Sequence, residues 1–477
     1  MRSFFFYDLE TSGFSPRYDR IMQFAGIRTD SDFNQIGDPV NLLIKMTDDI
    51  LPSPGAILTT HITPQQTIVE GISEADFCRY FLDEIAKPET VMLGYNNVRF
   101  DDEFMRHTLW RNFHDPYEWF WAEGRSRWDL LDVTRMVRAL RPAGINWPVK
   151  EIVNKDSGEK ITVGTVNLVD MAKSNNFENK QAHDALADVR ALINLAKLLK
   201  DRQPKMWDYL YSHRDKKSVA TVVRASRPVP FVYTSGRYSS KYEKTSVAIV
   251  IGPGSSDNNV LVWDLRYDPQ EFNAWSEEDI LATLTADYER RSKADFIPLP
   301  VKELSLNKCP AVAPLGTLDD DSQMRINLSQ KQIEEHLERL KDSRKLMAKV
   351  VSAWHKKPSF AGAKDVEGQL YDSLIPDEDK TKIRLVAAAS ETELADLHPE
   401  FIDDRLSKLL LRYKARQYPR SLSEAEQVEW EKYRATKLAH ELPRYLEELA
   451  KLAQTGADDF ILQELQLWAE SIVPVDY

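Results

Sequence analysis

Over residues 1–201, short apolar segments of strand type alternate with longer amphipathic segments of helical type. Segments 4–7, 21–28 and 41–45 are typical of strands joined by turns, which predicts an antiparallel meander at the start of the chain. The segment 90–94 is a further apolar strand. Helical periodicity is found at 73–85, 99–113, 130–140 and 182–199. Strands followed by alternating helices and strands build a sheet covered by helices, so we predict an α/β domain here.

The pattern changes beyond this region, and 477 residues are too many for one compact core. Val, Thr and Tyr are abundant at 219–251 and 259–265, which predicts a β domain with helices inserted at 276–288 and 329–354. Amphipathic segments at 401–417, 423–438 and 442–454 predict a helical domain near the end of the chain. The expected domains are therefore 1–201, 202–354 and 367–477, with a linker at 355–366.

Composition excludes several classes of protein. With Cys78 and Cys309 as its two cysteines, the chain has neither a disulfide scaffold nor a cysteine zinc cluster. The start of the chain lacks a secretory signal, and no run of about 18 apolar residues predicts a transmembrane helix, so we expect a cytoplasmic protein with no membrane partner. The formal net charge of −12 speaks against non-specific nucleic-acid binding, although clustered catalytic carboxylates would contribute to it. Local patterns must therefore identify the partner.

An acidic pair ends the first predicted strand. Asp8 and Glu10 are two residues apart, so both side chains project from the same face of a strand. Two carboxylates held so close repel each other unless a cation lies between them. Such a pair on its own is more often a solvated turn, so it does not by itself indicate a metal site.

Two further acidic motifs follow along the chain. Asp101 opens a predicted helix, where a carboxylate can either interact with the helix dipole or ligate a metal. In the segment AHDALAD, Asp184 can cap the next helix, which leaves His183 just before it. Asp184 and Asp188 share a helix face at a spacing of four residues, so the spacing does not choose between them as a metal ligand.

The three motifs occur in the order D-x-E, N-x-x-x-F-D and H-x-x-x-x-D. This ordered set resembles the histidine branch of the DEDD exonuclease superfamily, whose core is a ribonuclease H-like fold. The segments GYNNVRFDDE, RNFHDPY, SRWDLLDV, LRPAGINWP and NKCP resemble, more narrowly, the bacterial exodeoxyribonuclease I family. The resemblance extends through LYDSL and LLLRYKARQYP, and so covers essentially the whole chain. It implies that an SH3-like β-barrel domain with inserted helices and an all-α C-terminal domain follow the exonuclease domain.

The resemblance also implies a catalytic centre. Phosphodiester hydrolysis by two divalent metals needs several carboxylates that converge from different elements. By resemblance, Asp8, Glu10, Asp101 and Asp188 would hold two Mg²⁺ ions, with Mn²⁺ able to substitute, and Glu10 would also meet the terminal 3′-OH. His183 would accept a proton from the attacking water, which the pKa of histidine allows at neutral pH. The 3′→5′ direction of digestion rests on the resemblance, because residue types do not show it.

Binding a single strand without sequence preference needs aromatic stacking surfaces among cations. By resemblance, the positions on the DNA path are Glu10, Arg106, Tyr117, Trp121, Arg135 and Asn167. Asn167 stands where the family usually has a basic residue, so it can donate a hydrogen bond but lacks the charge. Trp128 is expected in the core. Ile62 either wedges near the terminal base or anchors its loop, and 237–244 is a second candidate contact.

The family also docks the acidic, Phe-ended tail of single-strand-binding protein on a basic surface. Arg141, Tyr209 and Lys341 fit such a site in this chain. Pro314 and Asp319 depart from it, because polar or basic residues are expected at their positions. The resemblance therefore predicts this partner with a weakened binding surface.

We accordingly predict a monomeric, Mg²⁺-dependent 3′→5′ exonuclease that degrades single-stranded DNA to 5′-mononucleotides in DNA repair and recombination. Two alternatives remain. An RNA-preferring 3′→5′ exonuclease would share all five catalytic residues, but small enzymes of that kind lack the long extension seen here. A catalytically inert scaffold that binds single strands would not need the intact set of Asp8, Glu10, Asp101, His183 and Asp188.

Overall fold

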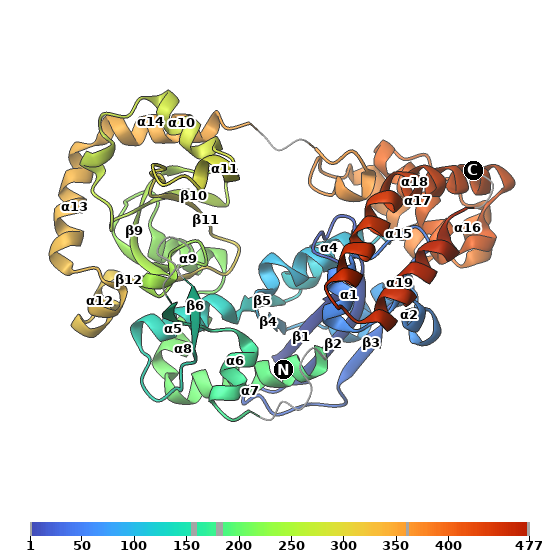
Figure 1. Ribbon diagram of the computed structural model, residues 1–477, viewed down its shortest axis with the longest axis horizontal. Helices are drawn as coiled ribbons and strands as arrows, with labels where there is room; N and C mark the ends of the chain where they lie inside the picture. The colour runs from blue at the N-terminus through green and yellow to red at the C-terminus, as the bar shows by residue number, and fades with distance from the viewer. Residues whose placement is uncertain (1, 154–159, 178–184, 359–361, 475–477) are drawn as a thin grey trace. The chain divides into compact units, whose positions relative to one another are not determined.

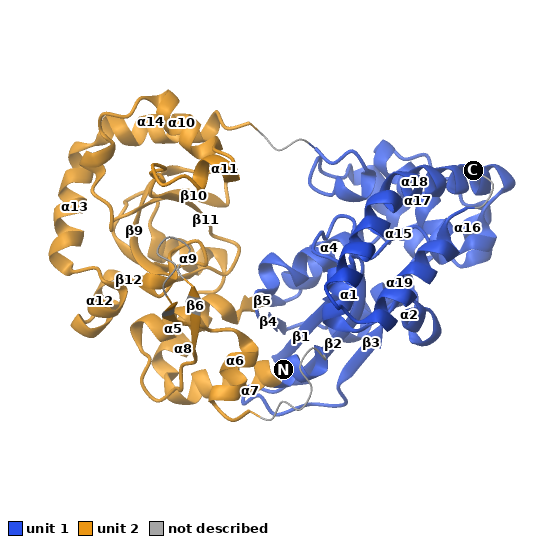
Figure 2. Ribbon diagram, in the orientation of Figure 1, with its two compact units in different colours: residues 1–126, 180–190, 361–477 blue, residues 127–179, 191–360 orange. Residues whose placement is uncertain are grey.

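The computed structural model describes residues 2–153, 160–177, 185–358 and 362–474. The chain forms two compact units (Figure 2), of which the first comprises residues 1–126, 180–190 and 361–477 and the second 127–179 and 191–360. The units do not follow chain order, because the C-terminal helices pack in the same unit as the N-terminal strands. The sequential division into 1–201, 202–354, 355–366 and 367–477 stays a prediction.

The first sheet has the strand order β3-β2-β1-β4-β5 (Figure 1). Its strands are β1 (Ser3–Thr11), β2 (Ile21–Thr29), β3 (Val40–Leu43), β4 (Thr90–Gly94) and β5 (Ser126–Asp129). Strand β1 pairs antiparallel with β2 and parallel with β4, and β2 pairs antiparallel with β3, which confirms the predicted meander. The chain passes from the first unit to the second within β5.

Helices pack on this sheet in the first unit. Helix α4 (Asp101–Arg111) packs on one face, where Phe104 and Met105 join Phe5 and Tyr7 of β1 in a buried cluster. The other N-terminal helices are α1 (Pro54–Thr60), α2 (Pro64–Glu70) and α3 (Glu74–Tyr80). The C-terminal part adds α15 (Asp377–Ala388), α16 (Glu391–Asp396), α17 (Asp404–Gln417), α18 (Glu424–Gln454) and α19 (Asp459–Ile472). Helix α7 (Ala185–Arg202) begins in this unit.

Helix α18 corrects a boundary in the sequence analysis. The segments 423–438 and 442–454 were expected to be separate helices, but they form one helix that contains Pro443. A proline removes one backbone hydrogen bond and normally interrupts a helix. Here Leu438, Tyr445 and Leu449, on both sides of the proline, are buried in one cluster with residues of α19, and this packing supports the continuous helix.

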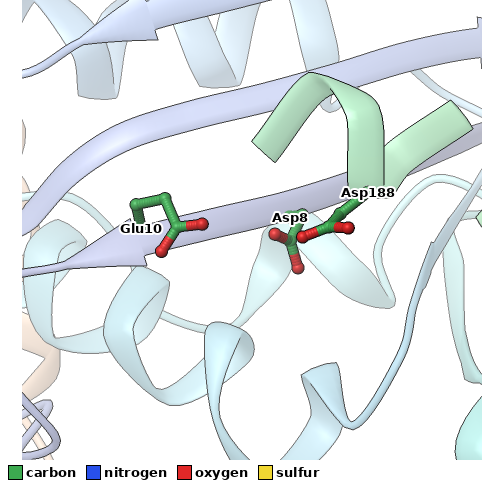
Figure 3. A group of neighbouring side chains, drawn as sticks. All are labelled: Asp8, Glu10 and Asp188. Carbon is green, nitrogen blue, oxygen red and sulfur yellow. The ribbon is translucent and has the colours of Figure 1, made fainter. Parts of the chain in front are cut away.

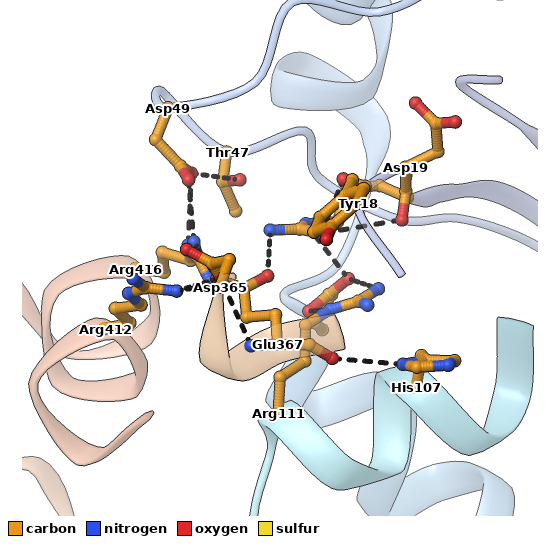
Figure 4. Close-up of polar contacts among 12 residues, drawn as sticks. Tyr18, Asp19, Thr47, Asp49, His107, Arg111, Asp365, Glu367, Arg412 and Arg416 are labelled. Atoms are coloured by element: carbon orange, nitrogen blue, oxygen red, sulfur yellow. Dashed lines mark hydrogen bonds and ion pairs between the residues drawn. The ribbon is translucent and has the colours of Figure 1, made fainter. Parts of the chain in front are cut away.

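A buried network of charged side chains ties the C-terminal helices to the N-terminal part of the first unit (Figure 4). Glu367, on the short 3₁₀ turn η7 (Val366–Gly368), accepts hydrogen bonds from Arg20 at 2.8 Å and from Arg416 of α17 at 2.6 Å. Arg416 also pairs with Asp49 at 2.6 Å. All four side chains are buried, so the network crosses from residues 20 and 49 to residues 367 and 416 without solvent between them.

The second unit is built around a five-stranded sheet with the order β11-β10-β9-β8-β12. These strands are β8 (Phe231–Thr234), β9 (Thr245–Pro253), β10 (Asn259–Asp264), β11 (Val301–Ser305) and β12 (Ala311–Pro314), and β6 (Val149–Val153) pairs with β7 (Lys160–Gly164) in a separate hairpin. The helices are α5 (Leu130–Leu140), α6 (Leu168–Ser174), α8 (Pro204–Ser212), α9 (Lys216–Val223), α10 (Glu277–Thr285), α11 (Tyr288–Arg291), α12 (Asp320–Ile326), α13 (Gln330–Asp342) and α14 (Arg344–His355).

Three details of the second unit differ from the expectation. Residues 219–223 belong to helix α9, where Val219 and Val223 are buried, although their valines suggested a strand. The expected helix at 276–288 is found as α10 but ends three residues earlier, at Thr285, and Tyr288 begins the separate short helix α11. The expected helix at 329–354 is divided at Ser343 into α13 and α14. In the part of the chain that the structure describes, no helix combines the length and apolar character needed to cross a membrane.

Candidate active site

Strand β1 carries two acidic side chains toward a common point. Asp8 and Glu10 are both partly exposed, whereas Tyr7, just before Asp8, and Leu9, between the two, point into the core. The register places Ala25 opposite Asp8 and Gln23 opposite Glu10. Directly opposite residues share a face of the sheet, so the small Ala25 leaves space beside Asp8. The two-residue period therefore places both carboxylates on one face, as expected.

The third carboxylate comes from helix α7. Asp188 lies in its first turn, and carboxylate oxygens of Asp8, Glu10 and Asp188 all lie within 4.8 Å of one another (Figure 3). In Figure 3 the side chains of Asp8 and Asp188 point toward each other, and Glu10 projects from the same strand as Asp8. More than 170 residues of chain separate β1 from α7, so folding brings these groups together.

Asp101 is the first residue of helix α4, which follows β4. Strands β1 and β4 run parallel, with Phe6 opposite Leu93, so their C-terminal ends lie at the same edge of the sheet. Helix α4 begins at Asp101 just beyond that edge, and Asp101 is buried. It is close enough to Asp8 for its negative charge to raise the pKa of the Asp8 carboxyl.

The electrostatics of Asp8 fit a cation site. Burial, and then the neighbouring carboxylates Asp101, Glu10 and Asp188, raise the pKa of Asp8 well above its ordinary value. The cause is that several negative charges converge in a partly desolvated space. Oxygen-rich acidic clusters of this kind suit a hard divalent ion such as Mg²⁺, whose charge would relieve the repulsion. The residues present therefore fit a bound divalent metal.

Two residues singled out in the sequence fall beyond what the structure covers. His183 and Asp184 both lie outside the described residues. The role of His183 thus stays a prediction that rests on its place five residues before Asp188 and on the resemblance. Of the two aspartates between which the spacing left the choice open, Asp188 is the one described beside Asp8 and Glu10.

Besides Glu10, three of the predicted DNA contacts belong to the first unit. Trp121 is 60% exposed, which leaves its ring available for stacking. Tyr117 is half-buried. Arg106 is buried, donates a hydrogen bond to Glu103 at 2.8 Å, and lies over the ring of Phe120. Its guanidinium therefore has a structural role in the free protein.

The remaining predicted contacts belong to the second unit. Arg135 pairs with Asp132 at 2.7 Å. Asn167 is exposed and caps α6, since its side-chain oxygen accepts hydrogen bonds from the amides of Val169 and Asp170. This leaves its amide nitrogen as the group able to donate to a phosphate. Trp128 is buried against Trp207, which confirms the expectation that it belongs to the core.

Ile62 also has a defined place in the first unit. It is buried, and its cluster includes Leu465 and Trp468 of α19, so it anchors its loop to the C-terminal helices. Ile62 also lines a polar pocket together with Gln23, Asn41 and His61. Because Gln23 lies opposite Glu10 in the sheet, this pocket adjoins the acidic site.

The sequence analysis missed a group of polar residues behind the carboxylates. The hydroxyl of Tyr7 donates a hydrogen bond to Asp102, and the amide of Asn97 donates to both at 3.3 Å. All three residues are buried. Tyr7 and Asp102 each stand next to a predicted metal ligand in the sequence, and this position was the one sign that they could matter. Neither residue type predicts a hydrogen bond between them.

Comparison with known proteins adds the family context. Three family models match successive parts of the chain: Exonuclease at residues 5–196, Exonuclease I SH3-like domain at 214–356, and Exonuclease I C-terminal domain at 364–472. The exodeoxyribonuclease I of Escherichia coli (strain K12) is 38% identical over 480 residues, which cover 99% of this chain and 98% of that protein.

Solved structures agree with the sequence matches. A crystal structure of E. coli exonuclease I in complex with a dA16 oligonucleotide matches with a TM-score of 0.93 at 37% identity, over 99% of this chain and 100% of that one. A zinc-bound form of an E. coli exonuclease I complex with single-stranded DNA matches with a TM-score of 0.92 at 37% identity, with the same coverage. The predicted fold is thus confirmed: an α/β exonuclease domain, an SH3-like domain and a helical C-terminal domain.

Proposed function

Because the chain belongs to the exodeoxyribonuclease I family, we propose that it degrades single-stranded DNA from the 3′ end and releases 5′-mononucleotides. The observation that carries this proposal is the convergence of Asp8, Glu10 and Asp188 within an exonuclease domain. The proposal includes a cytoplasmic location and a role in DNA repair and recombination. It also includes action as a monomer, since one chain supplies all the proposed metal ligands.

Asp8, Glu10, Asp101 and Asp188 would hold two divalent ions, with Mg²⁺ favoured by the all-oxygen donor set and Mn²⁺ able to replace it. The zinc ion in the E. coli complex supports a divalent-metal site in this family. When bound, such ions activate a water molecule and neutralise the charge that develops on the phosphate. The need to bind such ions explains why several acidic side chains lie around Asp8, although their mutual repulsion raises the pKa of its carboxyl.

The protein's own groups would then position the substrate and move protons. His183 would accept the proton of the attacking water as general base. Glu10, at the end of β1, would also accept a hydrogen bond from the terminal 3′-OH. A strand whose 3′ end lies inside a loop or is blocked could not present that hydroxyl, so digestion would require a free 3′ end.

Stacking and cationic contacts would hold the strand without reading its sequence. Trp121, which is 60% exposed, would offer its ring for base stacking. Tyr117, Arg106, Arg135 and Asn167 are the further contacts in the proposal, and 237–244 is another candidate. In the free protein Arg106 is buried and hydrogen-bonded to Glu103. In the proposal it contacts DNA while it keeps that hydrogen bond.

A gel assay tests reaction class, direction and cofactor together. The protein is incubated with a 5′-labelled single-stranded DNA in the presence of Mg²⁺, Mn²⁺ or EDTA. We expect a ladder that shortens from the 3′ end with either metal and intact DNA with EDTA. A matched oligonucleotide with a 3′-phosphate should resist digestion, since it lacks the 3′-OH that Glu10 would bind.

The two alternatives give different results in the same assay. Degradation of a matched RNA with intact DNA would identify an RNA-preferring exonuclease. Intact DNA and RNA, with DNA binding detected by fluorescence anisotropy, would identify an inert scaffold. Either result would overturn the proposed function.

We also propose that the second unit binds the acidic, Phe-ended tail of single-strand-binding protein. A pocket of about 550 Å³ supports this proposal, with a lining that includes Arg141, Lys205, Met206, Tyr209 and Pro314. Its apolar residues suit a terminal phenylalanine, and its cations suit acidic groups. Asp319 pairs with Arg141 at 3.0 Å and would compete with the tail for this guanidinium. Lys341, on α13, pairs with Glu338.

Fluorescence anisotropy with a labelled acidic peptide ending in Phe tests this partner. Arg141→Ala should weaken binding about 10-fold or more, because it removes a charged hydrogen-bond donor. Asp319→Ala should strengthen binding by up to about 5-fold, because it frees Arg141 from an exposed ion pair worth at most ~1 kcal/mol. A peptide ending in Ala serves as control. Equal binding of the Phe-ended and Ala-ended peptides would contradict the proposal.

A further inference from the structure

Behind the acidic site, the buried polar residues Tyr7, Asn97 and Asp102 form a small hydrogen-bonded cluster. Tyr7 donates to a carboxylate oxygen of Asp102, and the side-chain amide of Asn97 donates to the Tyr7 hydroxyl and to the same oxygen, both at 3.3 Å. Tyr7 and Asp102 are 1% and 0% exposed. Water therefore cannot replace these contacts without opening the core.

Each end of this cluster is adjacent in sequence to a proposed metal ligand. Tyr7 immediately precedes Asp8 in β1, and its side chain points to the opposite face of the strand. Asp102 immediately follows Asp101 in the first turn of α4. Consecutive helical residues point about 100° apart, so Asp102 can face Tyr7 while Asp101 faces the acidic site. A hydrogen bond between Tyr7 and Asp102 thus links the backbones that carry Asp8 and Asp101.

Asn97, the third residue of the cluster, lies in the turn between β4 and α4. A Cβ atom on Gly94 would lie 2.5 Å from Cβ of Asn97, so a glycine is required for Asn97 to fold back at this point. The side chain of Asn97 is fully buried as a result, and its amide reaches both Tyr7 and Asp102. The cluster therefore joins the ends of β1 and β4 to the first turn of α4.

We propose that Tyr7, Asn97 and Asp102 are positioning residues that hold Asp8 and Asp101 at the separation needed to share divalent metal. This inference rests on the proposed metal-dependent nuclease function. Without a bound cation, the carboxylates of Asp8 and Asp101 repel each other and favour a wider separation. A buried hydrogen-bonded clamp opposes that movement and so lowers the cost of assembling the site before metal binds.

The hydroxyl of Tyr7 is separable from the packing of its ring. The ring lies in the core cluster and stacks on Phe24 with a centroid distance of 6.1 Å. Tyr7→Phe keeps this packing and removes the hydroxyl, which donates to Asp102 and accepts from Asn97. Tyr445→Phe is a matched control, because Tyr445 is also a buried tyrosine of the first unit but belongs to a different cluster, formed with α19. Asn97→Ala is a second test variant that removes the other donor.

Direct metal binding is the decisive measurement. Mn²⁺ binding to the DNA-free proteins is measured by titration calorimetry or by the electron paramagnetic resonance of free Mn²⁺, and thermal unfolding verifies that each variant is folded. Tyr7→Phe and Asn97→Ala should raise the Mn²⁺ dissociation constant about 10-fold, as expected when a residue that orients metal ligands is lost. The Mg²⁺ concentration for half-maximal nuclease activity should rise by a similar factor, and Tyr445→Phe should leave both values unchanged.

The outcomes separate this inference from the proposed function. If the wild-type protein binds no Mn²⁺, the metal-dependent nuclease proposal fails. If the wild-type protein binds Mn²⁺ and both test variants bind it equally well, the positioning role is refuted even when their thermal stability falls. Weakened binding in the test variants but not in Tyr445→Phe would establish the role.

Discussion

Replacing His183 with alanine should lower the single-turnover rate of DNA cleavage by about 10²–10⁴-fold, the usual contribution of a general base. An ordinary histidine imidazole has a pKa near neutrality, so it can accept a proton from water and release it in each cycle. DNA affinity and thermal stability should change little, because the proposed ligands Asp8, Glu10, Asp101 and Asp188 remain. Rapid-quench cleavage of a 5′-labelled single strand at saturating Mg²⁺ measures the rate.

The pH dependence gives a second signature of this role. The wild-type rate should fall as the pH drops through about 6.5, where histidine becomes protonated and can no longer act as a base. His183→Ala should lose that part of the profile. His440→Ala, at an exposed position of α18, is the matched control and should behave as wild type. An unchanged cleavage rate in His183→Ala would exclude histidine as the base.

Replacing Arg416 with methionine should lower the free energy of local opening of α17 by about 3 kcal/mol, the low end of the range for breaking a buried ion pair. Arg416 contacts both Asp49 and Glu367, at 2.6 Å in each case (Figure 4). Methionine preserves much of the volume but leaves both carboxylates buried with fewer cations. Lys437 still contacts Asp49 and Arg20 still contacts Glu367, which limits the loss.

The pKa values of Asp49 and Glu367 determine how the stability lost in Arg416→Met depends on pH. Burial alone would raise the pKa values of Asp49 and Glu367, but the Arg416 guanidinium, followed by other cations, outweighs burial and holds both pKa values well below their ordinary range. Their stabilising contribution is therefore complete at neutral pH. It is lost as the pH falls below about 4 through the pKa values of the folded state. The difference between wild type and Arg416→Met should shrink over that acidic range.

Hydrogen exchange followed by mass spectrometry tests the effect locally. Peptides that cover α17 should exchange about 100-fold faster in Arg416→Met at neutral pH, since each 1.4 kcal/mol changes an opening equilibrium about tenfold. Arg290→Met is the control, because Arg290 forms an exposed pair with Asp295 at 2.7 Å and such pairs contribute at most ~1 kcal/mol. Equal exchange of α17 in wild type and Arg416→Met would contradict the stabilising role of the network.

Local patterns were sufficient for most elements of the first unit. The meander of β1, β2 and β3, strand β4 and helix α4 lie within a few residues of their expected positions, as does helix α5 of the second unit. They could be predicted because side-chain periodicity along a strand or helix is a local property. Helix α18 and the division between α13 and α14 were not predicted well. Their boundaries depend on which neighbouring residues pack together, and a single proline or serine does not determine this.

In the acidic site, too, some positions follow from local spacing and others only from the tertiary fold. The spacing of Asp8 and Glu10 already placed them on one face of a strand, since that face is set by a period of two residues. Asp188 reaches these two carboxylates, and Asp101 comes near Asp8, only because segments far apart along the chain fold together. The hydrogen bond from Tyr7 to Asp102 has no local signal at all, because 95 residues separate its partners.

By itself, the sequence determined the kinds of elements, their order, and the carboxylates and histidine that point to phosphodiester hydrolysis. The tertiary structure alone decided that the C-terminal helices share a unit with the N-terminal sheet, through contacts such as Arg416 with Asp49 across 367 residues. It also decided which polar residues support the acidic site from behind. The physical reason is that periodicity records which face of an element is buried, whereas buried hydrogen bonds and ion pairs depend on partners that only the folded chain brings within reach.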